Sequence, residues 1–290
     1  MQKELRTKIT IALFFLCFMI VWFVYVVTIS VPEKTQYYDK TQELSETGFC
    51  VFSDVLNISE INAMKTACKK GEYQKVKDSV FSSRKIRNII TSLGDGYELQ
   101  DYIWIIEKSS VHTCHRDNNG DFFNEGQQYP SYTMLVYLEE MDSCLSVLPT
   151  SHINPNMYWF NFTEPMHDIL CSIGDAVLFN ANLIHVGTFN KNPNRLRIQL
   201  KITHKTDRDK IAYYENFNKV LNRENNLPLA LRQIQRSLSC TFPALSDLTQ
   251  DENIRSSRGS DNGITIGILQ KLFSYVFYGD SDYYDLPNAF

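Results

Sequence analysis

The feature that most constrains this chain is an uncharged run near its N-terminus. From Ile9 to Val31 no residue carries a charge, and Phe, Ile, Val and Leu make up most of the run. A helix of this length rises ~34 Å, which is enough to cross a hydrocarbon core of ~30 Å. The run is longer than the apolar part of a cleaved signal peptide, and it contains no good small-residue cleavage site. The pattern predicts an uncleaved signal anchor, a transmembrane helix over residues 9–31.

Charged residues around this run predict its orientation. Lys3, Arg6 and Lys8 crowd the short N-terminal segment 1–8, whereas the lysines after the run are fewer and lie further from it. Because positive charge favours the cytoplasmic side of a membrane, we expect a single-pass type II membrane protein. Its N-terminus would be cytoplasmic, and its C-terminal body would lie in a lumen or outside the cell.

Two further features agree with a luminal or extracellular body. The sequons Asn57-Ile58-Ser59 and Asn161-Phe162-Thr163 are acceptors for N-glycosylation, so we expect a glycoprotein. Cys17 lies in the predicted anchor, and the remaining cysteines lie in the body: Cys50, Cys68, Cys114, Cys144, Cys171 and Cys240. These allow up to three disulfides in any of 15 pairings, with isolated buried thiols as the alternative. The absence of a CxxC pair argues against a zinc ribbon.

Composition limits the partners of the chain. Its 290 residues carry a formal net charge of -4 and have a sequence pI near 5.9. The chain therefore has no basic excess with which to neutralise a phosphate backbone, and we expect no nucleic-acid partner. With 43% hydrophobic residues it is able to bury one sizeable core. The oligomeric state stays open.

Beyond the anchor, the sequence divides into a stalk, a body and an extension. Residues 32–46 are polar and predict a stalk. Residues 47–205 predict the folded body, and residues 206–290 predict a helical C-terminal extension with a mobile segment at 246–263. The helices that we expect in the body and the extension are 59–70, 211–220 and 228–238, together with an apolar stretch at 267–277 that is too short to span a membrane.

Short strands dominate the body. Each is rich in β-branched or aromatic residues and is bounded by polar turn segments. The predicted strands are 49–52, 102–107, 132–138, 144–148, 176–179 and 195–202. Many short strands of this kind are typical of β folds with two packed layers. We predict a mainly β architecture with flanking helices (α+β), in which a double-stranded β-helix, or cupin-like jelly roll, follows the transmembrane helix.

His115 and Asp117 are candidate metal ligands. Residues two apart in an extended segment project to the same side, so these side chains are able to converge on one point. A His-x-Asp pair alone is common, and a third ligand must come from elsewhere. The best candidate is His185, which follows the apolar strand 176–179. Two imidazoles and one carboxylate on one face of an octahedron suit non-haem Fe(II) and oxygen chemistry.

Arg195 and Arg197 are candidate partners for the carboxylate of a cosubstrate. They follow His185 along the chain, and a guanidinium grips a carboxylate through two parallel hydrogen bonds. Both arginines point to the same side of the predicted strand, so alternation does not choose between them, while the spacing favours Arg195. His112 has the wrong parity relative to His115 for a shared metal site and is expected to be packed or solvated.

Several elements of the body occur in the order and spacing of a known family. They are Gly48-Phe49-Cys50-Val51-Phe52, His115-Arg116-Asp117, Pro149-Thr150-Ser151-His152, Gly174-Asp175-Ala176-Val177-Leu178-Phe179 with His185, and the arginine strand. Over about residues 47–204 the chain resembles the Fe(II)- and 2-oxoglutarate-dependent oxygenases of the phytanoyl-CoA dioxygenase type. Thr150 stands where this family has glycine, so we expect the turn to form without a positive φ.

The resemblance implies an activity and a set of cofactors. The residues implied to bind iron are His115, Asp117 and His185. Arg195 or Arg197 is implied to bind 2-oxoglutarate, with a secondary contact shifted to Thr188. The implied reaction uses Fe(II), 2-oxoglutarate and O2 to hydroxylate a C–H bond, and it releases succinate and CO2. The substrate class stays open between a small molecule, a lipid and a protein side chain.

Two other function classes compete with a dioxygenase. The first is a catalytically inactive, membrane-anchored jelly-roll binding protein; the presence of all three ligand types and of an arginine argues against it. The second is a type II glycan-modifying transferase, which would share the anchor and the sequons. The sequence lacks the acidic metal motif and the α/β pattern expected of a nucleotide-sugar domain.

Overall fold

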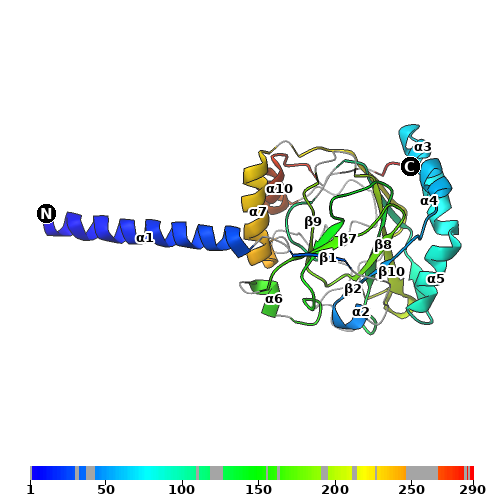
Figure 1. Cartoon of the computed structure of the whole chain (residues 1–290), viewed down its shortest axis with the longest axis horizontal. Coiled ribbons are helices and arrows are strands. Elements are labelled where there is room, and N and C mark those ends of the chain that lie inside the picture. Colours follow the sequence, from blue (N-terminus) through cyan, green and yellow to red (C-terminus); the bar gives the residue numbers. More distant parts are fainter. Residues whose placement is uncertain are drawn as a thin grey trace.

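The computed structural model (Figure 1) describes residues 2–29, 33–36, 43–108, 111–117, 127–154, 156–161, 164–190, 195–210, 214–225, 227–245, 267–283, 286 and 288–290. Its helices are α1 (Gln2–Ile29), α2 (Glu43–Glu46), α3 (Ile58–Lys69), α4 (Tyr73–Ser82), α5 (Arg84–Ser92), α6 (Asn156–Trp159), α7 (Leu229–Thr241) and α10 (Ile268–Tyr278), with a 3-10 turn, η1 (Lys205–Asp207). Its strands are β1 (Glu33–Gln36), β2 (Phe49–Phe52), β3 (Tyr97–Leu99), β4 (Tyr102–Ile106), β5 (Tyr132–Tyr137), β6 (Leu145–Val147), β7 (His167–Leu170), β8 (Ala176–Asn180), β9 (His185–Gly187), β10 (Arg197–His204) and β11 (Phe217–Leu221).

The strands form two sheets. The larger is seven-stranded, with the order β11-β4-β10-β5-β8-β2 and with β3 paired to β10, and the smaller is four-stranded, with the order β1-β7-β6-β9. Along the chain, β5, β8 and β10 lie in the larger sheet, while β6, β7 and β9 lie in the smaller one. The chain therefore winds back and forth between two layers, as in a jelly roll. The predicted mainly β body with flanking helices is confirmed.

Side-chain alternation along β5 separates the core into two clusters. Met134 and Val136 belong to a cluster shared with α3, α4 and α5, which cover the outer face of the larger sheet. Leu135 and Tyr137 belong to a second cluster, which also contains apolar residues of β6 and β7 from the smaller sheet. Leu135 and Tyr137 therefore point into the interior between the two sheets. Residues that pair with them on the neighbouring strands point to the same side.

The predicted strands of the body are all present, but the helix predicted at 211–220 is wrong. Phe217–Leu221, which overlaps that segment, forms β11, and this edge strand of the larger sheet pairs in parallel with β4. The ring of Phe217 stacks on that of Tyr102 with 4.7 Å between centroids. The local sequence pattern favours a helix only weakly here. Main-chain pairing with β4 and the aromatic contact of Phe217 outweigh this preference.

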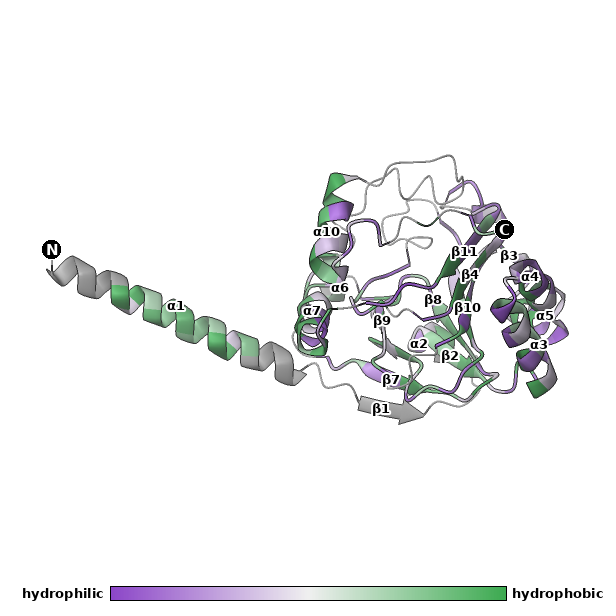
Figure 2. Cartoon of the chain, turned by 90° about the horizontal axis from the view of Figure 1, so that it is seen from above, coloured by the Kyte–Doolittle hydropathy of each residue, from purple (hydrophilic) through white to green (hydrophobic). Residues whose placement is uncertain are grey.

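Helix α1 extends away from the body, and its side chains are described for residues 9–23 (Figure 2). Trp22 contacts Phe242 at the end of α7, with ring centroids 6.5 Å apart. Among the residues whose side chains are described, which in α1 are 9–23, no helix combines the length and the hydropathy required to cross a membrane. From the predicted stalk, residues 33–36 form β1, which pairs with β7. The mobile segment predicted at 246–263 lies outside the described residues.

Two disulfides are present in the body. One joins Cys114 to Cys240, and the other joins Cys144 to Cys171. The sequence left the pairing open, and the structure selects these two. Cys50 and Cys68 are buried and take no part in a disulfide.

The turn at Thr150 differs from expectation. Its φ is +65°, so a β-branched residue occupies the left-handed region that favours glycine. The amide of Thr150 donates to the carbonyl of Thr47, with 3.0 Å between nitrogen and oxygen. The threonine therefore keeps the conformation that a glycine would allow, at a cost in backbone strain of about 1 to 3 kcal/mol.

Candidate metal site

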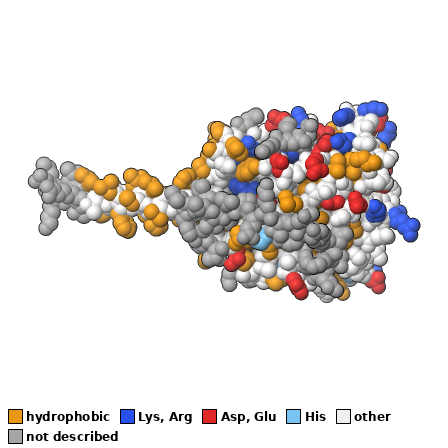
Figure 3. Space-filling model, viewed as in Figure 1, with side chains coloured by type: hydrophobic (Ala, Val, Ile, Leu, Met, Phe, Trp, Pro, Cys, Tyr) orange, Lys and Arg blue, Asp and Glu red, His pale blue; other side chains and the backbone are white. Residues whose placement is uncertain are grey.

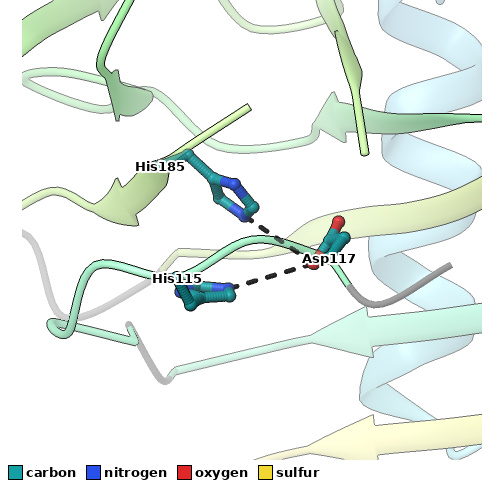
Figure 4. Close-up of side chains that lie close together, drawn as sticks. All are labelled: His115, Asp117 and His185. Atoms are coloured by element: carbon teal, nitrogen blue, oxygen red, sulfur yellow. Dashed lines mark ion pairs between the residues drawn. The ribbon is translucent and has the colours of Figure 1, made fainter. Parts of the chain in front are cut away.

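His115, Asp117 and His185 lie together in the structure, as predicted (Figure 4). His115 and His185 face each other across an antiparallel bridge, and their backbones exchange two N–H···O bonds of 3.0 and 2.9 Å. The amide of Asp117 donates to the carbonyl of Ala181, with a distance of 2.9 Å. Backbone pairing thus places the segment 111–117 beside the start of β9, and the distant histidine joins the His-x-Asp pair.

The donor atoms of these side chains surround one common space. Asp117 Oδ1 is 3.9 Å from His115 Nε2 and 3.8 Å from His185 Nε2. Both distances are too long for hydrogen bonds. All three ligand atoms lie within 4.8 Å of one another. The set of two imidazole nitrogens and one carboxylate oxygen is therefore able to hold a metal ion, and its chemistry fits Fe(II).

Both imidazoles are oriented by hydrogen bonds at their other ring nitrogen. His115 Nδ1 is 2.9 Å from the carbonyl oxygen of Thr113, and His185 Nδ1 is 2.9 Å from that of Leu183. A carbonyl only accepts, so each Nδ1 carries the proton and each Nε2 presents its lone pair to the common space. The local backbone therefore fixes the tautomer that a metal ion requires.

The charge states of the site also suit a metal ion. Burial lowers the pKa of His185 to about 3, and the neighbouring His115 acts in the same direction. Burial alone would raise the pKa of Asp117, but the charge and the hydrogen bond of the Lys201 ammonium hold this pKa well below its usual range. At neutral pH His185 is neutral and Asp117 is ionised, which are the forms that bind metal ions.

Lys201 belongs to this site and was missed in the sequence. Its side chain is 4% exposed, and its Nζ lies 2.6 Å from Asp117 Oδ2. The Thr133 hydroxyl donates to the same oxygen at 2.5 Å and accepts from Lys201 Nζ at 2.8 Å. The sequence did contain a signal for it: Lys201 has the same parity as Arg195 and Arg197, so the three side chains project from the same face of the strand. This alternation does not reveal which end of the strand lies near the metal ligands.

The predicted cosubstrate residues lie in different surroundings. Arg197 is buried on the inward face of β10, opposite Tyr137 in the register of the sheet. Arg195 precedes β10, and its Nη2 donates to the carbonyl of Asn190 at 2.7 Å. The Thr188 hydroxyl donates to the carbonyl of Ser143 at 2.6 Å. That bond commits the Thr188 proton to the protein backbone.

The buried Tyr137 hydroxyl has no hydrogen-bond partner among the described residues. Burial raises the pKa of Tyr137 well above its usual range, so the hydroxyl stays a proton donor. A buried donor without a partner is costly, and its position opposite Arg197 marks a place where an anionic group would be held. Tyr137 was not predicted from the sequence as a binding residue.

The C-terminal helices brace the segment that carries the first two ligands. The disulfide of Cys114 with Cys240 joins this segment to α7, and the Cys114 amide donates to the Ser239 hydroxyl at 2.9 Å. His112 Nε2 lies 2.9 Å from Gln235 Oε1. His112 is thus packed, as expected, and burial lowers its pKa to about 4. The extension therefore forms part of the support of the metal site.

Comparisons with known proteins give similarity in shape only. No family model and no curated protein match the chain. Similar solved structures include the non-heme alpha ketoglutarate dependent epimerase SnoN from nogalamycin biosynthesis, with 14% identity over 56% of this chain and 81% of that one, at a TM-score of 0.47. HygX from Streptomyces hygroscopicus, with nickel and 2-oxoglutarate bound, has 14% identity over 58% and 87%, at 0.45. EvdO2 from Micromonospora carbonacea var. aurantiaca has 13% identity over 59% and 94%, at 0.42.

These scores set the weight of the comparison. The three identities lie at 13% or 14%, and the three TM-scores do not exceed 0.47. A similarity at this level carries no argument about activity. The finer assignment to the phytanoyl-CoA dioxygenase type stays a prediction.

Proposed function

We propose that this chain is an Fe(II)- and 2-oxoglutarate-dependent dioxygenase that hydroxylates a C–H bond of its substrate and releases succinate and CO2. The observation that carries the proposal is the convergence of His115 Nε2, His185 Nε2 and Asp117 Oδ1, with both Nδ1 atoms held by carbonyl groups. Three protein ligands on one side of an ion leave positions for a chelating cosubstrate and for oxygen. When bound, iron with 2-oxoglutarate supplies the oxidising chemistry.

The residues of the chain have separate tasks in this proposal. The two imidazoles and the Asp117 carboxylate bind the ion. Arg197 and the Tyr137 hydroxyl, both buried between the sheets, receive the far carboxylate of 2-oxoglutarate. Because hydroxylation of a C–H bond requires no general base on the protein, none is assigned. The walls of the jelly roll keep water from the reacting groups.

Release of succinate tests the proposal. The full-length protein, purified in detergent, is incubated with Fe(II), ascorbate and 2-oxoglutarate in air, and succinate is measured by mass spectrometry. We expect slow succinate formation without added substrate, and none when Fe(II) or oxygen is omitted. Metal binding without any succinate would instead support the inactive binding protein and overturn the proposal.

Replacement of Arg197 is expected to weaken cosubstrate binding. A buried charge-assisted pair contributes about 1.5 to 3 kcal/mol, so Arg197→Met should raise the KM for 2-oxoglutarate at least ~10-fold. Arg195→Met is the matched control, because that residue precedes β10, is only partly buried and does not lie opposite Tyr137 in the register of the sheet. The KM is measured from succinate release at varied 2-oxoglutarate concentrations. A larger rise in KM for Arg195→Met than for Arg197→Met would contradict this assignment and would favour Arg195, as the spacing in the sequence does.

We also propose that α1 anchors the protein in a membrane with the body on the luminal or extracellular side. In support, most of the described side chains of α1 are apolar and exposed, including Phe14 at 75% (Figure 3). Helix α10 lies at the end of the body from which α1 extends (Figures 1 and 2). It carries exposed apolar residues, such as Ile268 with 83% of its surface exposed. The uncharged run over residues 9–31 provides the sequence argument.

Glycan mapping tests this placement. Asn57 is exposed, whereas the side chain of Asn161 is buried and donates to the Glu164 carbonyl at 2.8 Å. In cells with a glycosylating secretory pathway, we expect one glycan, at Asn57, which is lost in Asn57→Gln and kept in Asn161→Gln. The readout is the shift in electrophoretic mobility after glycosidase treatment, together with protease protection of the body in sealed vesicles. An unglycosylated body that protease digests in those vesicles contradicts the proposed orientation.

A further inference from the structure

The Lys201 ammonium, the Asp117 carboxylate and the Thr133 hydroxyl form a closed group beside the metal ligands. Lys201 Nζ and Thr133 Oγ1 both donate to Asp117 Oδ2, at 2.6 and 2.5 Å, and Nζ also donates to Thr133 Oγ1 at 2.8 Å. Lys201 and Thr133 are direct partners in the register of β10 and β5, so their side chains emerge on the same face. The strand pairing itself therefore places two donors on one carboxylate oxygen.

Because of this group, the two oxygens of Asp117 have different roles: one accepts hydrogen bonds, and the other faces the candidate metal position. Oδ2 is occupied by two donors, whereas Oδ1 faces the imidazoles of His115 and His185 at 3.9 and 3.8 Å. A carboxylate with both oxygens free is able to grip an ion with both, as Asp and Glu do at calcium sites. Here only Oδ1 is available, so the protein would fill three positions around an ion and leave the others open.

The group also sets the electric charge of the site. The Asp117 carboxylate and the Lys201 ammonium carry opposite charges that cancel, with 2.6 Å between Oδ2 and Nζ. A divalent ion and the Arg197 guanidinium then give the site an excess of three positive charges. A chelator with two carboxylates carries two negative charges and is attracted by this excess. Without Lys201 the excess is smaller by one charge, so the same chelator would be attracted less strongly.

We propose, on the basis of the dioxygenase assignment above, that Lys201 is a positioning residue that limits Asp117 to one-oxygen ligation and adds a positive charge that attracts a dianionic cosubstrate. Lys201 repels the ion and also withholds one ligand oxygen from it, so it weakens binding of the metal alone. It strengthens binding of 2-oxoglutarate to the metal-loaded protein. These two effects have opposite signs, which a merely structural residue would not produce.

Calorimetry on Lys201→Met tests the proposal. Mn(II) serves as the metal and 2-oxoglutarate as the cosubstrate, each titrated into the full-length protein in detergent without oxygen. Since a buried ammonium near a divalent ion repels it strongly, we expect Mn(II) to bind at least ~5-fold more tightly to the variant. Binding of 2-oxoglutarate to the Mn(II) form should weaken at least ~10-fold.

Two matched variants and a spectrum complete the experiment. Lys201→Arg keeps the charge, so its 2-oxoglutarate affinity should stay within ~3-fold of the unaltered protein. Lys219→Met removes another buried lysine, which lies on β11 over the ring of Phe217, and should change neither affinity. Visible absorption of the Co(II) form should differ between Lys201→Met and the unaltered protein, because the second carboxylate oxygen becomes a ligand.

The outcomes separate this inference from the function on which it rests. If the unaltered protein binds neither Mn(II) nor 2-oxoglutarate, the dioxygenase proposal fails together with the inference. If the unaltered protein binds both, and Lys201→Met weakens both or changes neither, the role of Lys201 alone is overturned. Tighter metal binding together with weaker cosubstrate binding, in a variant whose circular-dichroism spectrum matches that of the unaltered protein at the assay temperature, supports it.

Discussion

His185→Ala is expected to abolish metal binding and, with it, all formation of succinate. His185 supplies the third donor atom from a strand distant in the chain, and its Nε2 lies 3.8 Å from Asp117 Oδ1. Loss of residues that merely orient a ligand costs about 10- to 100-fold in metal affinity, so loss of the ligand itself should cost at least ~100-fold. Mn(II) calorimetry and metal content after dialysis measure the first effect, and succinate release measures the second.

His185→Ala is a better test than Asp117→Ala because the two side chains differ in charge. At neutral pH the imidazole of His185 is neutral, because burial lowers its pKa to about 3. Removing it therefore leaves no unpaired charge. Asp117→Ala would leave the buried Lys201 ammonium without its carboxylate, and breaking a buried pair costs about 3 to 5 kcal/mol. A variant that fails to fold would say nothing about metal binding.

A second histidine provides the control. His167 lies on β7 in the smaller sheet and is outside the group that is able to hold a metal ion. We expect His167→Ala to keep both the metal content and the rate of succinate release. Metal binding by His185→Ala at the affinity of the unaltered protein would show that the three side chains do not form the site, and the proposed function would lose its foundation.

Local pattern was sufficient to predict much of the fold. The strands later seen as β2, β4, β5, β6, β8 and β10 were predicted within a few residues of their ends, because each combines β-branched or aromatic residues with flanking turns. β11 was not predicted, since its stability comes from pairing with β4 and from the contact of Phe217 with Tyr102. Such contacts between distant segments are not encoded in the local pattern.

The metal ligands were predictable for a different reason than the residues around them. The alternation of an extended segment places His115 and Asp117 on one side, which is a property of neighbours in the chain. Lys201 lies at the site because β10 pairs with β5 in a register that sets it against Thr133. Register is a property of two strands together, and one sequence does not reveal it.

Removal of the disulfide between Cys114 and Cys240 is expected to weaken both the fold and the metal site. The bond closes a loop with a sequence separation of 126 residues, so its loss should lower the free energy of unfolding by about 2 to 5 kcal/mol. Cys114 directly precedes the ligand His115, and Cys240 lies on α7. Without the bond, the segment that carries two ligands is held to α7 by hydrogen bonds such as that from the Cys114 amide to Ser239.

The double variant Cys114→Ala/Cys240→Ala tests this against a matched pair. The control, Cys144→Ala/Cys171→Ala, removes the other disulfide, which has a sequence separation of 27 and no cysteine next to a metal ligand. Urea unfolding should show the smaller loss of stability for the control, because the shorter loop constrains the unfolded chain less. Only the first variant should bind Mn(II) more weakly, by at least ~10-fold, since disturbed support of a ligand lowers metal affinity on that scale. Equal metal affinity in the two variants would mean that α7 stabilises the fold without positioning His115.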